Sequence, residues 1–81
     1  MNGLRITVKL LATYRRYLPP GSKGAYQSAV PPGATVRDLL AQLPLPPADG
    51  KVILVNGRGA PPDHILREGD VVAIFPAIAG G

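Results

Sequence analysis

The sequence predicts one small α+β domain, spanning residues 1–81, in which a mixed β-sheet packs on one main helix. Three observations predict this class. The segment LRITVKL (4–10) alternates apolar and polar residues, as a half-buried strand does. The segment VVAIF (71–75) is apolar throughout, which suits a strand in the middle of a sheet. Between them, residues 36–43 carry one apolar stripe with helical spacing.

The N-terminal half predicts two strands joined by a helical turn. Ala12 to Leu18 forms the turn, which Pro19-Pro20-Gly21 closes. The short segment AYQSAV (25–30) is predicted to be an edge strand that pairs back on the first strand. In the first strand, the residues expected to face the core are Ile6, Val8 and Leu10, and those expected to face water are Arg5, Thr7 and Lys9.

The helix is predicted from its cap and its stripe. Thr35 is a good N-cap, and Asp38 three positions later forms a weak capping box. Pro44 ends the helix. The apolar stripe consists of Val36, Leu39, Leu40 and Leu43.

The C-terminal half predicts two more strands. KVILV (51–55) is an apolar run that ends in Asn56-Gly57, a strong signal for a tight turn. Residues 60–66 are irregular and contain His64, which we interpret as a loop residue and not as a metal ligand. The turn at 68–70 leads into the last strand. Placing that strand beside the first, and parallel to it, gives the β-grasp or ubiquitin-like fold.

Composition excludes several classes of function. Cysteine is absent, which removes disulfides, thiolate nucleophiles and Cys-ligated zinc. No apolar run approaches the roughly 20 residues of a membrane span, and no signal-peptide segment is recognisable, so we expect a soluble cytoplasmic protein. The net charge of +4 suits an acidic protein partner. Nucleic-acid binding is not expected, because the basic residues are scattered and only Arg15 and Arg16 are adjacent.

No self-contained active site is visible, and no metal site is expected. Neither serine has a histidine nearby, and the acids sit beside turns or at the helix start. The chemistry is therefore expected at the C-terminus. Pro76 lacks an N–H and should end the hydrogen-bond ladder, so that residues 76–81 project as a flexible tail without a pairing partner. Gly80 and Gly81 lack Cβ and would let the terminal carboxylate enter a narrow site, where adenylation by ATP would make it reactive toward sulfur or nitrogen nucleophiles.

The strings that carry a family resemblance are VNGR (55–58), LREGDVVAIFP (66–76) and AGG (79–81), with RITVKLLATYRRYLPPG (5–21) and PPGATVRDLL (31–40). Through these strings the chain resembles the MoaD/ThiS family of sulfur carriers over essentially its whole length, and the Phe75-Pro76 pair looks most like the small subunit of molybdopterin synthase. Many relatives have a second proline where this chain has Ala77.

The resemblance implies a carrier that is not an enzyme on its own and binds no cofactor. An E1-like adenylyltransferase would activate Gly81 with ATP, and a sulfurtransferase would convert it to a thiocarboxylate. The large subunit of molybdopterin synthase would then receive the sulfur for the molybdenum or tungsten cofactor. Ile78, Ala79 and Gly80 would lie in the partner's channel.

Other functions remain open at this point. The chain could be the thiamin-pathway sulfur carrier, or a ubiquitin-like modifier whose Gly81 is conjugated to lysines. A hypothesis of a different class is a non-catalytic β-grasp module that binds RNA or protein, in which Gly80-Gly81 is only a frayed end.

The last strand also predicts a partner-binding surface. Val72 and Ile74 are assigned to the core, whereas Phe75 is assigned to the outer face. Together with Ala73, Pro76 and Ile78, Phe75 would form an apolar patch with a basic rim, a composition typical of protein-binding sites. The competing interpretation is that Phe75 is a core residue.

Overall fold

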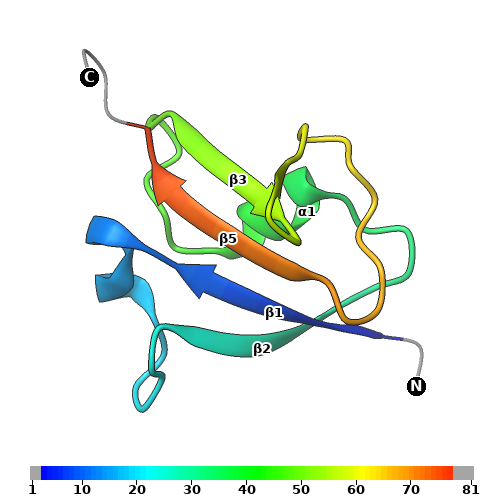
Figure 1. The fold of residues 1–81 in the computed structure, drawn as a ribbon, viewed down its shortest axis with the longest axis horizontal. Helices are drawn as coiled ribbons and strands as arrows, with labels where there is room; N and C mark the ends of the chain where they lie inside the picture. The colour runs from blue at the N-terminus through cyan, green and yellow to red at the C-terminus, as the bar shows by residue number, and fades with distance from the viewer. Residues whose placement is uncertain (1–2, 78–81) are drawn as a thin grey trace.

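The structure is a computed structural model that describes residues 3–77 of the 81-residue chain (Figure 1). The described residues form one five-stranded sheet, one α-helix and one 3-10 helix. In chain order, the elements are β1 (Leu4–Leu10), the 3-10 helix η1 (Ala12–Tyr17), β2 (Ala25–Val30), α1 (Val36–Gln42), β3 (Lys51–Val55), β4 (Arg58–Gly59) and β5 (Val71–Pro76).

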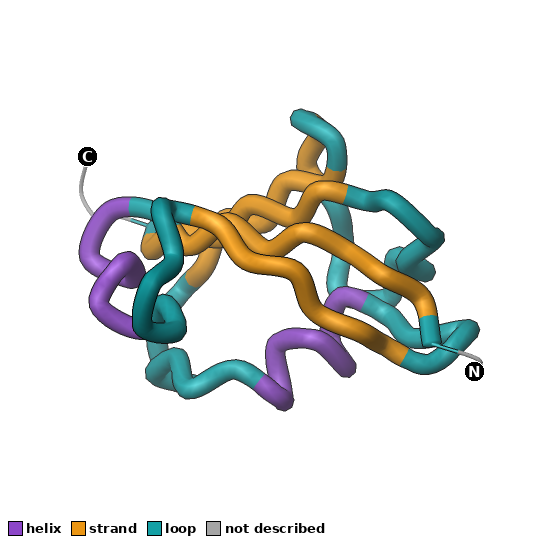
Figure 2. The backbone as a smooth tube through the Cα atoms, turned by 90° about the horizontal axis from the view of Figure 1, so that it is seen from below, coloured by secondary structure: helices purple, strands orange, loops and turns teal. Residues whose placement is uncertain are grey.

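The sheet has the strand order β2-β1-β5-β3-β4. β5 lies in the middle, parallel to β1 and antiparallel to β3, and β2 is the predicted edge strand. Figure 2 shows α1 against one face of the sheet, and residues 3–77 place no helix on the opposite face. The prediction of a mixed sheet on one helix is confirmed.

The core lies between the sheet and α1, on the face that the alternation predicted. Ile6, Val8 and Leu10 of β1 are buried, as are Val72 and Ile74 of β5. The remaining buried apolar residues are Tyr14, Val30, Ala34, Val36, Leu39, Leu45, Val55 and Leu66. Tyr14 is among the core residues that the sequence does not predict, because residues 12–18 indicate only a helical turn.

The capping box of α1 is confirmed. Thr35 Oγ1 accepts a bond from the Asp38 N–H at 3.2 Å, and Asp38 Oδ2 accepts one from the Thr35 N–H at 3.0 Å. Two donors at the helix N-terminus are thereby satisfied. Leu40 and Leu43 complete the stripe but are only half-buried.

Strand β4 was missed by the sequence analysis. Asn56 (φ 53°) and Gly57 (φ 84°) both adopt left-handed backbone conformations, as a tight two-residue hairpin turn requires. The turn pairs Val55 with Arg58, and Leu54 with Gly59. Arg58 and Gly59 are both exposed, so this two-residue strand has no apolar alternation from which it could be predicted.

Strand β5 ends at Pro76, as the sequence predicts, but the expectation that the chain has no pairing partner after Pro76 was wrong. β5 runs through Pro76, and the Ala77 N–H still donates to the Gly50 carbonyl at 2.9 Å. Since Ala77 faces β3, the neighbouring Pro76 nitrogen faces the β1 side, and β1 has already ended at Leu10. The proline therefore removes no ladder bond, and the chain stays paired for one residue more.

Candidate functional site

The sequence-predicted site residues fall into two groups in the structure. Ala73, Phe75 and Pro76 belong to β5 and Ala77 follows it, whereas Ile78, Ala79, Gly80 and Gly81 lie outside the described residues. The candidate site is therefore described from the end of β5, which we call the tail root (Pro76 and Ala77), and from the surface around it.

The face of Phe75 agrees with the expectation. Val72 and Ile74 are 0% exposed on the core side, and Phe75 is partly exposed on the other side. Phe75 pairs with Val52, and Ala73 pairs with Leu54 on the same face. We call these four half-buried residues the outer patch. The assignment of Phe75 to the core is thus not supported.

Two details of this surface differ from the expectation. Pro76 alternates to the side of Ile74 and pairs with Lys51, so it does not border Phe75 on the outer face. Val52 and Leu54, in contrast, join the patch and were not predicted. The signal was present in KVILV, because a run that is apolar at successive positions has apolar side chains on both faces of the strand.

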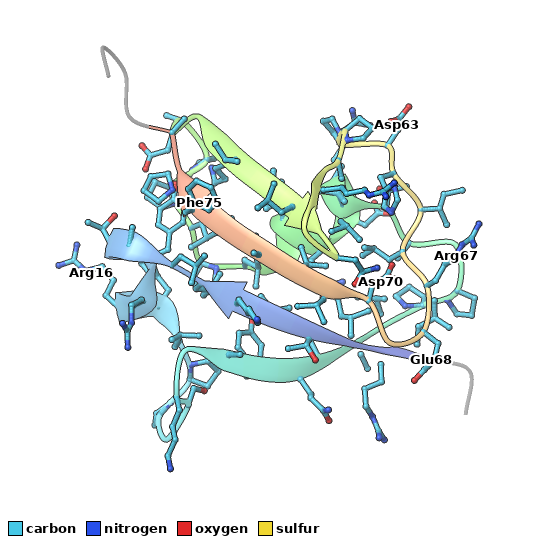
Figure 3. All side chains as sticks on the ribbon, viewed as in Figure 1. Arg16, Asp63, Arg67, Glu68, Asp70 and Phe75 are labelled. Atoms are coloured by element: carbon cyan, nitrogen blue, oxygen red, sulfur yellow. The ribbon has the colours of Figure 1, made fainter. Side chains whose placement is uncertain are left out.

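The outer patch has basic residues near it. Lys9 pairs with Ala73 in the parallel register and is exposed. Figure 3 shows Arg16 on η1, at the same end of the molecule as Phe75, and Arg15 beside it in sequence is also exposed. Leu11, at the start of η1, is 37% exposed and adds an apolar side chain at this end. The composition fits contact with an apolar surface that carries acidic residues.

A hydrogen-bond network closes the opposite end of the sheet. Asp70 is 8% exposed, and its two carboxylate oxygens accept from Asn56 Nδ2 and from the Arg67 N–H, both at 2.9 Å. Asn56 Oδ1 accepts from the Val71 N–H at 2.9 Å. The network joins the β3–β4 turn to the start of β5. Asn56 is thus a turn residue, as expected, with an additional role in holding β5.

A cavity of about 740 Å³ lies beside this network. It is lined in part by Arg58, Asp63, His64 and Arg67. Figure 3 shows Asp63, Arg67 and Asp70 at the end of the sheet away from Phe75. The cavity therefore lies away from the tail root, and we do not assign to it the chemistry that the sequence predicts at the C-terminus.

Within residues 3–77, no group of three or more His, Cys, Asp or Glu side chains could hold a metal ion. No helix in the same range is long and apolar enough to cross a membrane.

Comparisons with known proteins place the chain among small ubiquitin-like proteins. A model of the ThiS family matches residues 8–81. The putative molybdopterin converting factor subunit 1 from Pyrococcus furiosus is 27% identical, with a TM-score of 0.74, over 93% of this chain and 99% of that chain. SAMP1 from Haloferax volcanii is 25% identical, with a TM-score of 0.70, over 95% of this chain and 99% of that chain.

The ubiquitin of Caldiarchaeum subterraneum is similar in fold alone, at 19% identity and a TM-score of 0.62, over 99% of this chain and 100% of that chain. No curated protein sequence matches the chain. The predicted β-grasp, ubiquitin-like fold is confirmed by these likenesses.

Proposed function

Because the chain belongs to the ThiS family of ubiquitin-like sulfur carriers, we propose that Gly81 carries sulfur as a thiocarboxylate and that the protein serves as the small subunit of a molybdopterin synthase. The observation that carries the finer part of the proposal is the likeness to the Pyrococcus converting factor subunit, which extends over nearly all of both chains. The match to the family model also reaches residue 81.

The proposed cycle uses the terminal carboxylate as the reacting group. A carboxylate oxygen of Gly81 attacks the α-phosphorus of ATP in an adenylyltransferase, and pyrophosphate leaves. Sulfur at the sulfide level, delivered by a sulfurtransferase, then attacks the acyl carbon and displaces AMP, which leaves a thiocarboxylate. A large synthase subunit binds the loaded carrier and directs this sulfur to a pterin precursor.

The domain itself contributes binding and presentation in this proposal. The outer patch and the basic residues Lys9, Arg15 and Arg16 contact the partner, whereas Gly80 and Gly81 enter its active site. Glycine suits this path, because the backbone can pass a constriction that a Cβ would block. In the partner's channel, Ile78 and Ala79 connect the tail root to the reacting carboxylate.

Intact-mass spectrometry tests the proposal. The protein is incubated with an adenylyltransferase, ATP and a sulfur donor, and the expected product is heavier by the difference between sulfur and oxygen. A variant lacking Gly81 and a variant extended by one alanine are the controls, and neither should gain this mass. Failure of the unaltered protein to load, or loading of the extended variant without trimming, would contradict the carrier function.

The acceptor is tested in a second step. The loaded carrier is mixed with a large synthase subunit and the cyclic pterin precursor, and formation of a dithiolene is expected. Sulfur transfer to a thiazole-forming enzyme instead would assign the protein to thiamin synthesis. Covalent adducts between Gly81 and lysine side chains would identify a protein modifier.

A further inference from the structure

Ala77 is the last residue that the structure describes, and it contacts the segment 46–50, which connects α1 to β3. Ala77 donates its N–H to the Gly50 carbonyl at 2.9 Å, and Pro76 pairs with Lys51. A Cβ placed on Gly50 would lie 3.6 Å from the Ala77 Cβ, so the two backbones run close together. The direction in which the chain leaves the tail root therefore depends on how Gly50 is held.

Lys51 directly follows Gly50, and its side chain bonds back to the loop that precedes Gly50. Its ammonium group donates to the Pro46 carbonyl at 2.6 Å and to the Asp49 carbonyl at 3.1 Å. Bonds from a charged donor are the stronger kind, and two of them close residues 46–51 into a compact loop. Lys51 thus restrains the loop whose Gly50 carbonyl accepts from Ala77.

Tyr14 restrains Asp49, the residue that directly precedes Gly50. Its hydroxyl donates to Asp49 Oδ2 at 3.2 Å, while its ring is only 1% exposed and is fixed in the core. Burial, and to a lesser degree the Asp49 carboxylate, raise the pKa of Tyr14, so the hydroxyl stays protonated and remains a donor at neutral pH. The η1 helix that carries Tyr14 is itself tied to β5, because Leu11 donates its N–H to the Ile74 carbonyl at 3.0 Å.

These bonds converge on a loop that the core does not hold in place. Pro47, Asp49 and Gly50 are exposed, and the segment has no regular secondary structure. Leu45 is buried in the core and already fixes the chain after α1. The connection from α1 to β3 could therefore form without the side-chain bonds at Asp49 and Lys51, the two neighbours of Gly50. What these bonds restrain in addition is the acceptor of the Ala77 N–H.

We propose that Tyr14, Asp49 and Lys51 are positioning residues, which fix the tail root and so present Gly81 to the activating enzyme in one direction. This role rests on the proposed carrier function. If these three residues no longer restrain the tail root, about one more residue must lose its conformational freedom when the C-terminus enters the partner. The expected loss is therefore about five- to thirtyfold in apparent affinity.

The test compares two variants with two matched controls. Lys51→Met removes the ammonium donors and keeps an apolar side chain, and its control is Lys23→Met at an exposed position. Tyr14→Phe removes only the hydroxyl, and its control is Tyr26→Phe, at a half-buried tyrosine whose pKa is also raised by burial. Tyr26 lies on β2, away from the tail root.

The first measurement is amide hydrogen exchange, which needs no partner. Lys51→Met is expected to speed exchange of the Ala77 amide about five- to thirtyfold, with Tyr14→Phe changing it in the same direction, while the amides of Val72 and Ile74 stay unchanged. The controls should leave Ala77 as it is. Unchanged exchange at Ala77, or a rise in step with Val72 and Ile74, would overturn the proposal.

The second measurement is pyrophosphate release by the adenylyltransferase with ATP. Because the ordering cost is met on binding, Lys51→Met should raise the KM for the carrier about five- to thirtyfold and leave kcat nearly unchanged. Normal KM and kcat in a variant with faster Ala77 exchange would refute the positioning role. If the unaltered protein is not adenylated, the proposed function fails, and hydrogen exchange still decides whether the three residues restrain the root.

Discussion

Replacing Phe75 by alanine separates a binding role from a packing role. A fully buried phenylalanine costs about 3–5 kcal/mol when it is truncated to alanine. Phe75 keeps part of its surface in water and faces away from the core, so its removal leaves no closed cavity. We therefore expect a loss of about 1–2 kcal/mol, out of about 4–12 kcal/mol for a domain of this size.

The assay pairs a denaturant melt with a binding titration against the adenylyltransferase or the large subunit. Phe75→Ala is expected to weaken association by about 2 kcal/mol, which corresponds to roughly thirtyfold. Ile74→Val is the matched control, because it costs a similar ~0.5–1.5 kcal/mol of stability on the core face. Ile74 is 0% exposed, so this control should leave partner affinity unchanged.

Three results would refute the reasoning. A stability loss of about 3–5 kcal/mol for Phe75→Ala would mean that the side chain packs as a core residue. A small stability loss with unaltered affinity for both partners would mean that the outer patch is not the contact surface. An equal loss of affinity in Ile74→Val would point to general destabilisation.

Three further predictions concern stability. Asn56→Ala should cost about 1–3 kcal/mol in a denaturant melt, since Asp70 and the Val71 N–H lose their partners, and a cost near zero would mean that water replaces them. Thr35→Ala should cost about 1 kcal/mol through the lost cap, and an unchanged melt would argue against the capping box. Burial raises the folded-state pKa of Tyr14 above its ordinary value of 10.0, so its contribution is full below that pH and is lost as the pH rises through the folded value. As the pH is raised above 10.0, Tyr14→Phe should therefore lose less thermal stability than the unaltered protein, and equal losses would contradict the shift.

The parts of the fold that follow from local patterns were predictable. The core face of β1 follows from its alternation of apolar and polar residues, and the start of α1 follows from Thr35 and Asp38, whose bonds span three residues. The short strand β4 was not predictable, because the turn before it imposes its pairing. The extra bond at Ala77 was missed because the side to which the Pro76 nitrogen points depends on where β1 ends.

The candidate site could likewise be predicted only in part from local patterns. The face of Phe75 follows from the period of the strand, but its neighbour Val52 depends on the register between β3 and β5. The bond from Tyr14 to Asp49 joins residues 35 positions apart, and neither residue stands out in the sequence. Contacts of this range come from the packing of η1 against the loop, and no local pattern encodes them.

The strings that carry the family resemblance lie at both ends of the sheet and have different roles there. Asn56 and Asp70, from VNGR and LREGD, tie the β3–β4 turn to the start of β5, at the end away from the tail root. Any domain that needs this joint could use the same residues, so these strings argue for the fold more than for sulfur chemistry. Evidence for the proposed partner and acceptor must therefore come from the other end, where Phe75 and the tail root are the described residues nearest the C-terminus. For that reason the decisive variants are Phe75→Ala and Lys51→Met, and Asn56→Ala should lower stability without changing the KM for the activating enzyme.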